Sequence, residues 1–292
     1  MPELPEVETM VRGIRPAVEG RTIVRVERVR CACRPLTLRP PWRTLKRQLE
    51  GRRVERVRRA GKRIVWDLDD GCALVIEPRM TGLVVLDDPP DTAHLRLKFE
   101  LESTPQGTRT RVWFWDRRGL GTVSLLDAHE LSRTLGPGRL GPDALRLTAD
   151  DWQRICHGRR QAIKTLLMDQ RKVAGIGNLY ASEILHEARI HPCTPAGVLK
   201  RRQLRRLADA VRRVLQEAIE HEGSTLGDGT YRTALNAPGR YQNLHRVYGR
   251  AGERCAHCRR GRIRRIVQAQ RATFYCPVCQ RPPRSAAGVS LP

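Results

Sequence analysis

In this chain of 292 residues, the spacing of apolar residues changes from that of strands to that of helices at a segment rich in glycine and proline. Residues 22–126 hold short runs of Val, Ile, Leu and Trp, several of which alternate with polar residues as strands do. Residues 135–142 then contain three Gly and two Pro, a composition typical of a domain boundary. Beyond it, apolar residues recur at helical spacing in 149–157, 162–169, 178–188 and 199–220. The pattern predicts an α+β fold, with an antiparallel β-sandwich or barrel followed by a helical domain.

The stretch before the first strand predicts a helix over residues 5–19, with an unusual start. If ordinary maturation removes Met1, the ring nitrogen of Pro2 becomes a free secondary amine beside the carboxylate of Glu3. An amine beside a carboxylate can act as a nucleophile beside a proton shuttle. The same acidic residues, with Pro5 at a first helical position, also suit an ordinary helix start. From these residues alone both interpretations stay open.

Four of the nine cysteines form two C-x₂-C pairs that enclose 17 residues. This spacing is typical of a structural zinc site with Cys255, Cys258, Cys276 and Cys279 as ligands, on a hairpin whose strands are expected at 262–267 and 272–275. Four thiolates suit one tetrahedral Zn²⁺ and leave no position for a substrate, and a redox dithiol is the less favoured alternative. Cys31-Ala32-Cys33 is too short and isolated for a metal site, and we interpret it as incidental.

The charge of the chain favours a polyanionic partner. Lys and Arg number 55 against 31 Asp and Glu, which gives a net charge of +24 and indicates nucleic acid. A membrane-surface protein would need a basic helix with large apolar residues, whereas the long basic helix at 199–220 carries small aliphatic ones. No membrane span and no signal peptide are expected, so the chain should remain in a reducing cytosol. The Gly-rich loop 223–245 is long enough to be a functional segment.

Seven motifs in order resemble the formamidopyrimidine-DNA glycosylase family, the bacterial base-excision enzymes related to endonuclease VIII. They are Met1–Thr9, Gly61–Arg63, Met80–Gly82, Asp116–Arg118, Val173–Glu183, Val247–Gly249 and Gln270–Cys276. The resemblance implies a catalytic β-sandwich domain led by a helix (1–134) and a helix–two-turn–helix DNA-binding domain with a lesion-capping loop (143–245). A four-cysteine zinc finger (246–280) and a disordered tail (281–292) complete the expected order.

The resemblance also implies a set of catalytic residues. Processed Pro2 would attack the sugar C1′ carbon, and Glu3 would protonate the sugar ring oxygen. Lys62 matches a strand lysine assigned to β-elimination. Arg271, near the tip of the zinc hairpin, matches the arginine that grips two phosphates for δ-elimination, which a bidentate guanidinium suits.

Further residues are expected to contact DNA. Met80, Arg118 and Leu120 occupy the positions that fill the gap left by a flipped-out base, although the family usually has an aromatic where Leu120 stands. Glu77-Pro78-Arg79 replaces a His-Leu-Gly segment whose histidine contacts phosphate, which puts lesion searching and base preference in doubt. The remaining expected contacts are His94, Arg159, Arg160, Lys164 and Asn178.

The resulting hypothesis is a bifunctional DNA glycosylase and AP lyase that acts as a monomer on double-stranded DNA with oxidised purines, in the bacterial cytoplasm at the nucleoid. One alternative is an endonuclease VIII-like preference for oxidised pyrimidines, which Met80 disfavours and Leu120 keeps open. Another is a non-catalytic DNA-binding zinc protein, which would have no need for a free N-terminal proline.

Overall fold

A computed structural model describes residues 2–86, 88–103 and 110–282 and divides the chain into two compact units. The first comprises Met1–Arg139 and Ala218–Gln242, and the second comprises Leu140–Glu217 and Asn243–Pro292. Within the described ranges, no helix is both long and apolar enough to cross a membrane. Most of the expected tail, residues 283–292, lies outside the described residues.

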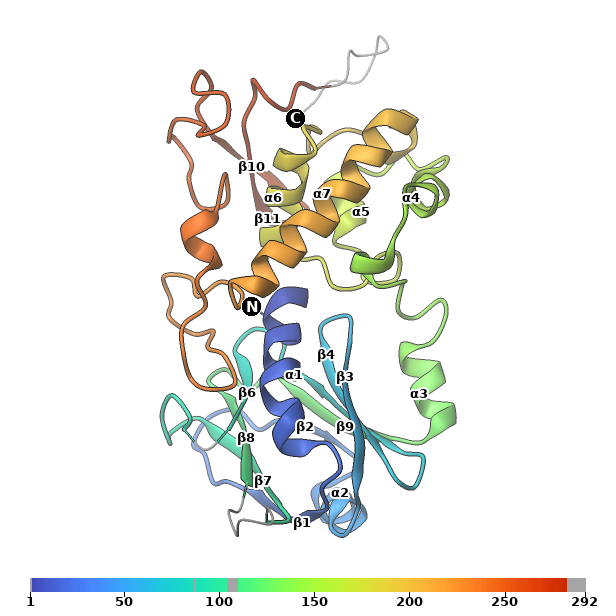
Figure 1. Ribbon diagram of the computed structural model, residues 1–292, viewed down its shortest axis with the longest axis vertical. Helices are drawn as coiled ribbons and strands as arrows, with labels where there is room; N and C mark the ends of the chain where they lie inside the picture. Colours follow the sequence, from blue (N-terminus) through green and yellow to red (C-terminus); the bar gives the residue numbers. More distant parts are fainter. Residues whose placement is uncertain (1, 87, 104–109, 283–292) are drawn as a thin grey trace. The chain divides into compact units, whose positions relative to one another are not determined.

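The first unit contains the predicted sandwich of two sheets (Figure 1). One sheet has the order β1-β7-β8-β6, and the other has the order β2-β9-β5-β4-β3. Every pairing is antiparallel except that of β2 with β9, which is parallel. The strands are β1 (Ile23–Arg28), β2 (Thr37–Arg39), β3 (Val54–Ala60), β4 (Arg63–Leu68), β5 (Ala73–Glu77), β6 (Gly82–Leu86), β7 (Leu95–Leu101), β8 (Thr110–Asp116) and β9 (Thr122–Leu126).

Helix α1 (Leu4–Val18) closes the sandwich core. Its buried stripe includes Val7, Met10 and Ile14, which belong to one apolar cluster with residues of both sheets. Residues 218–242, here called the return segment, add Tyr231 and Ala234 to the same cluster. Burial of this continuous apolar surface is the main force that holds α1 in place.

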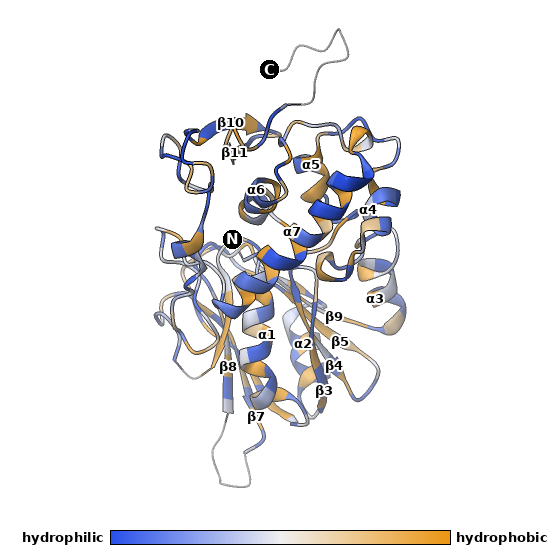
Figure 2. Cartoon of the chain, turned by 45° about the horizontal axis from the view of Figure 1, so that its top comes forward, coloured by the Kyte–Doolittle hydropathy of each residue, from blue (hydrophilic) through white to orange (hydrophobic). Residues whose placement is uncertain are grey.

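The second unit contains helices and the metal hairpin. Its elements are η1 (Ala144–Arg146), α4 (Ala149–Cys156), α5 (Ile163–Leu167), α6 (Asn178–Glu187), η2 (Ala196–Val198), α7 (Arg201–Glu220), β10 (Arg264–Gln268) and β11 (Arg271–Tyr275). The last turn of α7, from Ala218, and the first half of η3 (Tyr241–Leu244) belong to the return segment. Figure 2 shows hydrophilic and hydrophobic residues alternating along α7, as expected for an amphipathic helix with a buried apolar stripe.

Two α-helices and two strands of the described residues were not expected: helices α2 (Trp42–Leu49) and α3 (Ala128–Leu135), and strands β2 and β9. Helix α3 has no buried residue and begins at a capping box of Asp127 and Glu130, so it has no apolar stripe to detect. The structure also groups residues 218–242 with the sandwich, whereas the sequence led us to expect 143–245 as one domain. The reason is apolar packing between residues far apart in the chain.

Candidate active site and zinc centre

The chain start is buried and held by one carboxylate. Pro2 and Glu3 are buried, and Glu3 directly precedes α1. The carboxylate of Glu6 accepts the backbone N–H of Glu3 at 2.9 Å through Oε2 and the backbone N–H of Ser224 at 2.9 Å through Oε1. Glu6 therefore ties the expected nucleophile to the return segment. Burial, followed by the nearby charge of Glu6, raises the pKa of Tyr231, whose hydroxyl donates to the Glu222 carbonyl at 3.0 Å.

Lys62 lies in the two-residue turn between β3 and β4, and this turn is connected to α1. Arg59 donates to the Gly61 carbonyl at 3.1 Å and to Glu8 of α1 at 2.9 Å. Although burial acts to raise the pKa of Glu8, hydrogen bonds from Arg12 and Arg59 hold it below its usual value. Glu8 is thus an anion at neutral pH, and its pairing with Arg59 fixes the Lys62 turn against the helix that begins beside Glu3.

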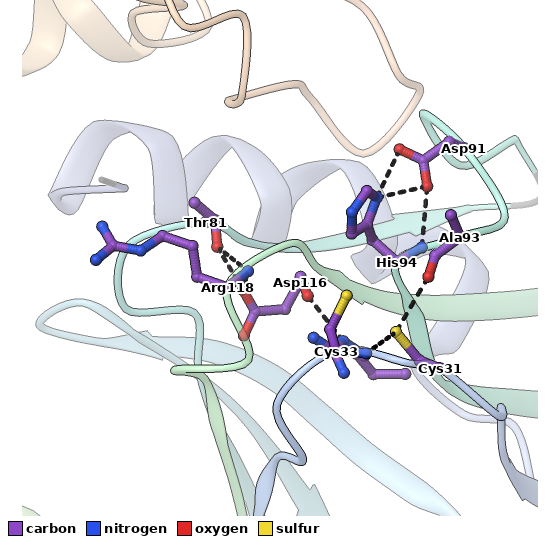
Figure 3. A network of polar contacts seen from close by, with 9 residues as sticks. Cys31, Cys33, Thr81, Asp91, Ala93, His94, Asp116 and Arg118 are labelled. Carbon is purple, nitrogen blue, oxygen red and sulfur yellow. Dashed lines mark hydrogen bonds and ion pairs between the residues drawn. The ribbon is translucent and has the colours of Figure 1, made fainter.

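Asp116 is fully buried and organises the turns that carry the three expected gap-filling residues (Figure 3). Its Oδ1 accepts the Thr81 hydroxyl at 2.5 Å and the Arg118 N–H at 3.2 Å, and its Oδ2 accepts the Gly121 N–H at 2.8 Å. Met80, which is 38% exposed, precedes Thr81 on the 78–82 turn. Exposed Arg118 and half-buried Leu120 lie on the 116–121 turn. One carboxylate therefore sets the geometry of both turns.

His94 has an acidic neighbour in the same unit. Its Nδ1 lies 2.9 and 3.0 Å from the two carboxylate oxygens of Asp91 (Figure 3). Its ring meets Trp115 edge-on. Burial acts to raise the pKa of Asp91, but hydrogen bonds from His94 and Trp115 hold it below its usual value. The expected DNA contact at His94 stays a prediction.

In the second unit, Lys164 joins the start of α6 to the zinc hairpin. Its side chain is buried, and its Nζ donates to Asn178 Oδ1 at 2.7 Å, Thr273 Oγ1 at 2.7 Å and the Ala272 carbonyl at 3.1 Å. These contacts make Lys164 a residue that positions Asn178 and β11, and a direct contact with the lesion stays a prediction. A buried ammonium with such acceptors is stable, because each donor replaces a lost water contact.

The other expected DNA contacts of this unit lie at its surface. Arg160 is exposed, and half-buried Arg159 donates to the Ile155 carbonyl at 2.6 Å. Arg271 is exposed and pairs with Gln268 across a two-residue turn, which places it beside the hairpin tip as expected. The chain enters α6 through Gly175, whose N–H donates to the side chain of Gln170 at 3.0 Å.

The predicted zinc ligands lie together at the base of the hairpin. The sulfur atoms of Cys255, Cys258, Cys276 and Cys279 all lie within 4.8 Å of one another. Two of the separations are 3.9 Å (Cys255–Cys279) and 3.7 Å (Cys258–Cys276), near the edge of about 3.8 Å that a tetrahedron with Zn–S bonds of about 2.3 Å requires. Burial and the neighbouring thiols raise the pKa of Cys279, and a cation between the sulfurs would favour its thiolate. The residues fit one structural Zn²⁺.

Two positioning residues have roles that the sequence did not reveal. Glu6 reads as an ordinary acid in a first helical turn, and its partner Ser224 lies far along the chain. Glu183, within α6, accepts the backbone N–H groups of Arg246, Val247 and Tyr248 at 2.7–3.0 Å. Burial raises its pKa. Each glutamate lies inside a motif that resembles the family, and this was the only signal in the sequence. The signal did not identify Ser224 or residues 246–248 as their partners.

Comparisons with known proteins agree on one family. The formamidopyrimidine-DNA glycosylase N-terminal domain matches residues 1–123, and the H2TH domain of the same enzymes matches residues 140–229. A zinc finger found in these enzymes and in isoleucyl-tRNA synthetases matches residues 252–282. Proteins named formamidopyrimidine-DNA glycosylase are similar over 96% of this chain: that of Chloroflexus aurantiacus is 39% identical over 98% of its own length, and that of Rhizorhabdus wittichii 41% over 100%.

Solved structures agree with this result. The MutM (Fpg) protein of Thermus thermophilus has a TM-score of 0.81 and 38% identity, covering 97% of this chain and 100% of its own. The Lactococcus lactis Fpg, bound to DNA with an abasic site, has a TM-score of 0.83 and 29% identity, covering 96% of this chain and 99% of its own. The same Lactococcus protein has also been solved with DNA that contains Fapy-dG, a ring-opened guanine lesion. By sequence and by structure, this chain belongs to the formamidopyrimidine-DNA glycosylase family.

Proposed function

We propose that this protein is a bifunctional DNA glycosylase and AP lyase that removes oxidised purines from double-stranded DNA. The observation that carries the proposal is the buried start of the chain, where Glu6 holds the backbone beside Pro2 and Glu3. A chain that only bound DNA would have no need to bury and fix an N-terminal proline. The net charge of +24 supports a DNA partner, and the protein is proposed to act as a monomer in the bacterial cytoplasm.

The chemistry begins once Met1 has been removed and the target base has left the stack, which costs a few kcal/mol. The Pro2 nitrogen attacks C1′, a C–N bond forms, and the bond to the damaged base breaks. Glu3 donates a proton to the ring oxygen as the sugar opens to an iminium. An α-amino group has a reference pKa of about 7.7–8, against about 10.4 for lysine. A larger fraction of the Pro2 amine than of a lysine amine is therefore neutral near pH 7.

Strand cutting follows from the charge of the iminium. That charge acidifies the proton at C2′, whose loss expels the phosphate on the 3′ side, and Lys62 is the proposed proton carrier of this β-elimination. A second elimination expels the phosphate on the 5′ side, with Arg271 gripping the phosphates that flank the lesion. The product is a gap with a phosphate at both ends.

Substrate choice depends on the turns held by Asp116. Met80, Arg118 and Leu120 are proposed to fill the gap in the duplex, and Asn178, Arg159, Arg160 and His94 to contact the backbone. Leu120 can wedge between bases but stacks poorly, which keeps oxidised pyrimidines as the second candidate substrate. Lys164 acts in this scheme by positioning Asn178 and Ala272, the residue next to Arg271.

The decisive experiment is borohydride trapping, which reduces the iminium to a stable protein–DNA bond. Duplexes with 8-oxoguanine or with an oxidised pyrimidine are incubated with the protein, and the cross-linked peptide is identified by mass. We expect the peptide that begins at Pro2, with faster trapping on 8-oxoguanine. A protein with a non-removable extension before Pro2 should bind DNA but neither excise nor trap. Trapping through another residue would refute the proposed nucleophile, and faster trapping on the pyrimidine would reverse the substrate assignment.

A further inference from the structure

The proposed function leaves the pair Cys31 and Cys33 unused, although the structure gives it defined contacts. Both cysteines are partly exposed, in the connection between β1 and β2. The Cys31 thiol donates to the Ala93 carbonyl at 3.0 Å and accepts the backbone N–H of Cys33 at 3.4 Å (Figure 3). The chain bends at Ala32 and Cys33, which brings positions 31 and 33 closer than the roughly 7 Å of an extended chain. Disulfides usually join residues whose Cα atoms are about 4.4–6.8 Å apart, most often about 5.5–6 Å.

The two thiols line a cavity that also contains a buried arginine. The cavity has a volume of about 300 Å³, and Arg28, Arg30 and Arg96 line it together with Cys31 and Cys33. Arg96 is 4% exposed, and its Nη2 has no hydrogen-bond partner within the described part of the chain. The hydrogen bond with Cys31, and then burial, raise the pKa of Cys33, while the charge of Arg96 acts to lower it. The raised pKa favours the thiol form of Cys33, and the Arg96 guanidinium offsets part of that rise toward the thiolate, the reactive form of cysteine.

The same arginine connects the cysteines to the 116–121 turn. Its Nη1 donates to the Arg34 carbonyl at 3.0 Å, and its Nε donates to the Asp116 carbonyl at 2.7 Å. Gly119, with φ of +61°, lies so close to this segment that a Cβ there would be 2.1 Å from the Arg34 oxygen. The residue that follows Cys33 therefore packs against the turn that carries Arg118 and Leu120.

We propose that Cys31 and Cys33 form a thiol switch that a hydroperoxide closes into a disulfide, with a loss of lesion binding. One thiolate attacks the peroxide, an S–O bond forms, the O–O bond breaks, and water or an alcohol leaves. The second thiol then attacks the sulfenic sulfur, an S–S bond forms, and water leaves. Two thiols are oxidised and one peroxide is reduced, and a thiol reductant reverses the step.

The expected consequence is a change in the 116–121 turn. Oxidation removes the S–H that donates to the Ala93 carbonyl, and the new ring redirects the chain into Arg34. The bonds from Arg96 to Arg34 and Asp116 then cannot both keep their geometry. Because the turn is proposed to fill the gap in the duplex, this inference rests on the proposed function. Loss of one charge-assisted hydrogen bond predicts about a tenfold weaker affinity for a lesion duplex.

The test uses the full zinc-bound protein, treated with hydrogen peroxide and then with catalase. Mass mapping should show that the peptide with Cys31 and Cys33 has lost two hydrogen atoms. Affinity for a duplex with an uncleavable abasic analogue should fall about tenfold and recover with dithiothreitol. Cys31→Ser, which keeps a donor for Ala93, should resist this loss, whereas Cys72→Ser, a control in the same unit, should respond like the wild type. Zinc content is measured in parallel, and every variant keeps the four zinc ligands.

Two outcomes with the wild-type protein would overturn the switch: no disulfide at Cys31 and Cys33, or a disulfide with unchanged affinity. An equal loss of affinity in Cys31→Ser would also overturn it, since the effect would then come from another site. These outcomes are distinct from failure of the proposed function, in which the reduced wild-type protein would neither trap nor cleave a lesion duplex.

Discussion

The substitution Glu6→Gln tests whether the carboxylate behind the N-terminus positions the nucleophile. Glutamine has nearly the same volume, but it has one acceptor oxygen and one NH₂ group where Glu6 has two acceptors. Only one of the N–H groups of Glu3 and Ser224 can keep its bond, and the other would face a donor. A buried N–H that loses a charged acceptor costs about 2–4 kcal/mol.

This cost should appear in both stability and rate. At about 2–4 °C per kcal/mol, the melting temperature of the free protein should fall by about 4–16 °C. If about 1.4 kcal/mol of the loss reaches the barrier for attack by Pro2, single-turnover borohydride trapping slows about tenfold. DNA affinity should change little, since Glu6 is buried and contributes no surface charge.

Glu130→Gln is the matched control. Glu130 also accepts the N-cap backbone N–H of its helix, from Asp127 at 3.2 Å, but it is exposed and lies away from the chain start. Its replacement should lower the melting temperature by no more than a few degrees and leave trapping unchanged. Trapping by Glu6→Gln at the wild-type rate would show that the return segment does not position Pro2.

Three further substitutions or conditions test the second unit. Lys164→Met should weaken DNA binding about tenfold or more, measured by fluorescence anisotropy, because Asn178 loses its buried cationic donor. Lys164→Arg keeps the positive charge but changes the shape of the donor group, so it tests which of the two is needed. Removal of zinc by a chelator should release one zinc ion per chain, unfold the hairpin and abolish DNA binding, and Cys276→Ser should have the same effect. Retained DNA binding would contradict the zinc assignment. Burial lowers the pKa of His245 to about 4, so the unfolded chain, with a His pKa of about 6.5, binds the proton first on acidification. Stability should therefore fall as the pH drops from about 6.5 to 4, and His245→Gln should reduce this slope in pH-dependent urea unfolding.

The sequence predicted those parts of the fold that local patterns determine. Alternation identified β7, and helical spacing identified α6 nearly to the residue. Strand β2 could not be predicted in this way, because it has three residues and its parallel partner β9 lies more than eighty residues later. Helix α2 follows two prolines and buries only Leu45 and Leu49, which leaves too weak a pattern to detect.

The candidate site likewise has parts that local patterns predict and parts that depend on distant contacts. The cysteine spacing was sufficient to predict the metal centre, because the ligands lie in two short local pairs. The buried role of Lys164 was not predictable, since two of its three acceptors lie more than a hundred residues away. Charge alone favours the surface for a lysine, and only the fold shows that acceptors surround this one.

The return segment has a consequence for how the protein is made. Its residues 218–242 complete the core around α1, yet they leave the ribosome only after residues 140–217 of the second unit. A nascent chain that has released only its first 139 residues lacks Tyr231 and Ala234 and leaves their apolar partners uncovered. Chains that end early therefore cannot anchor their own N-terminus, even though Pro2 is the first residue synthesised after the initiator. The Pro2 amine is therefore not held in a firm position until the return segment has been synthesised.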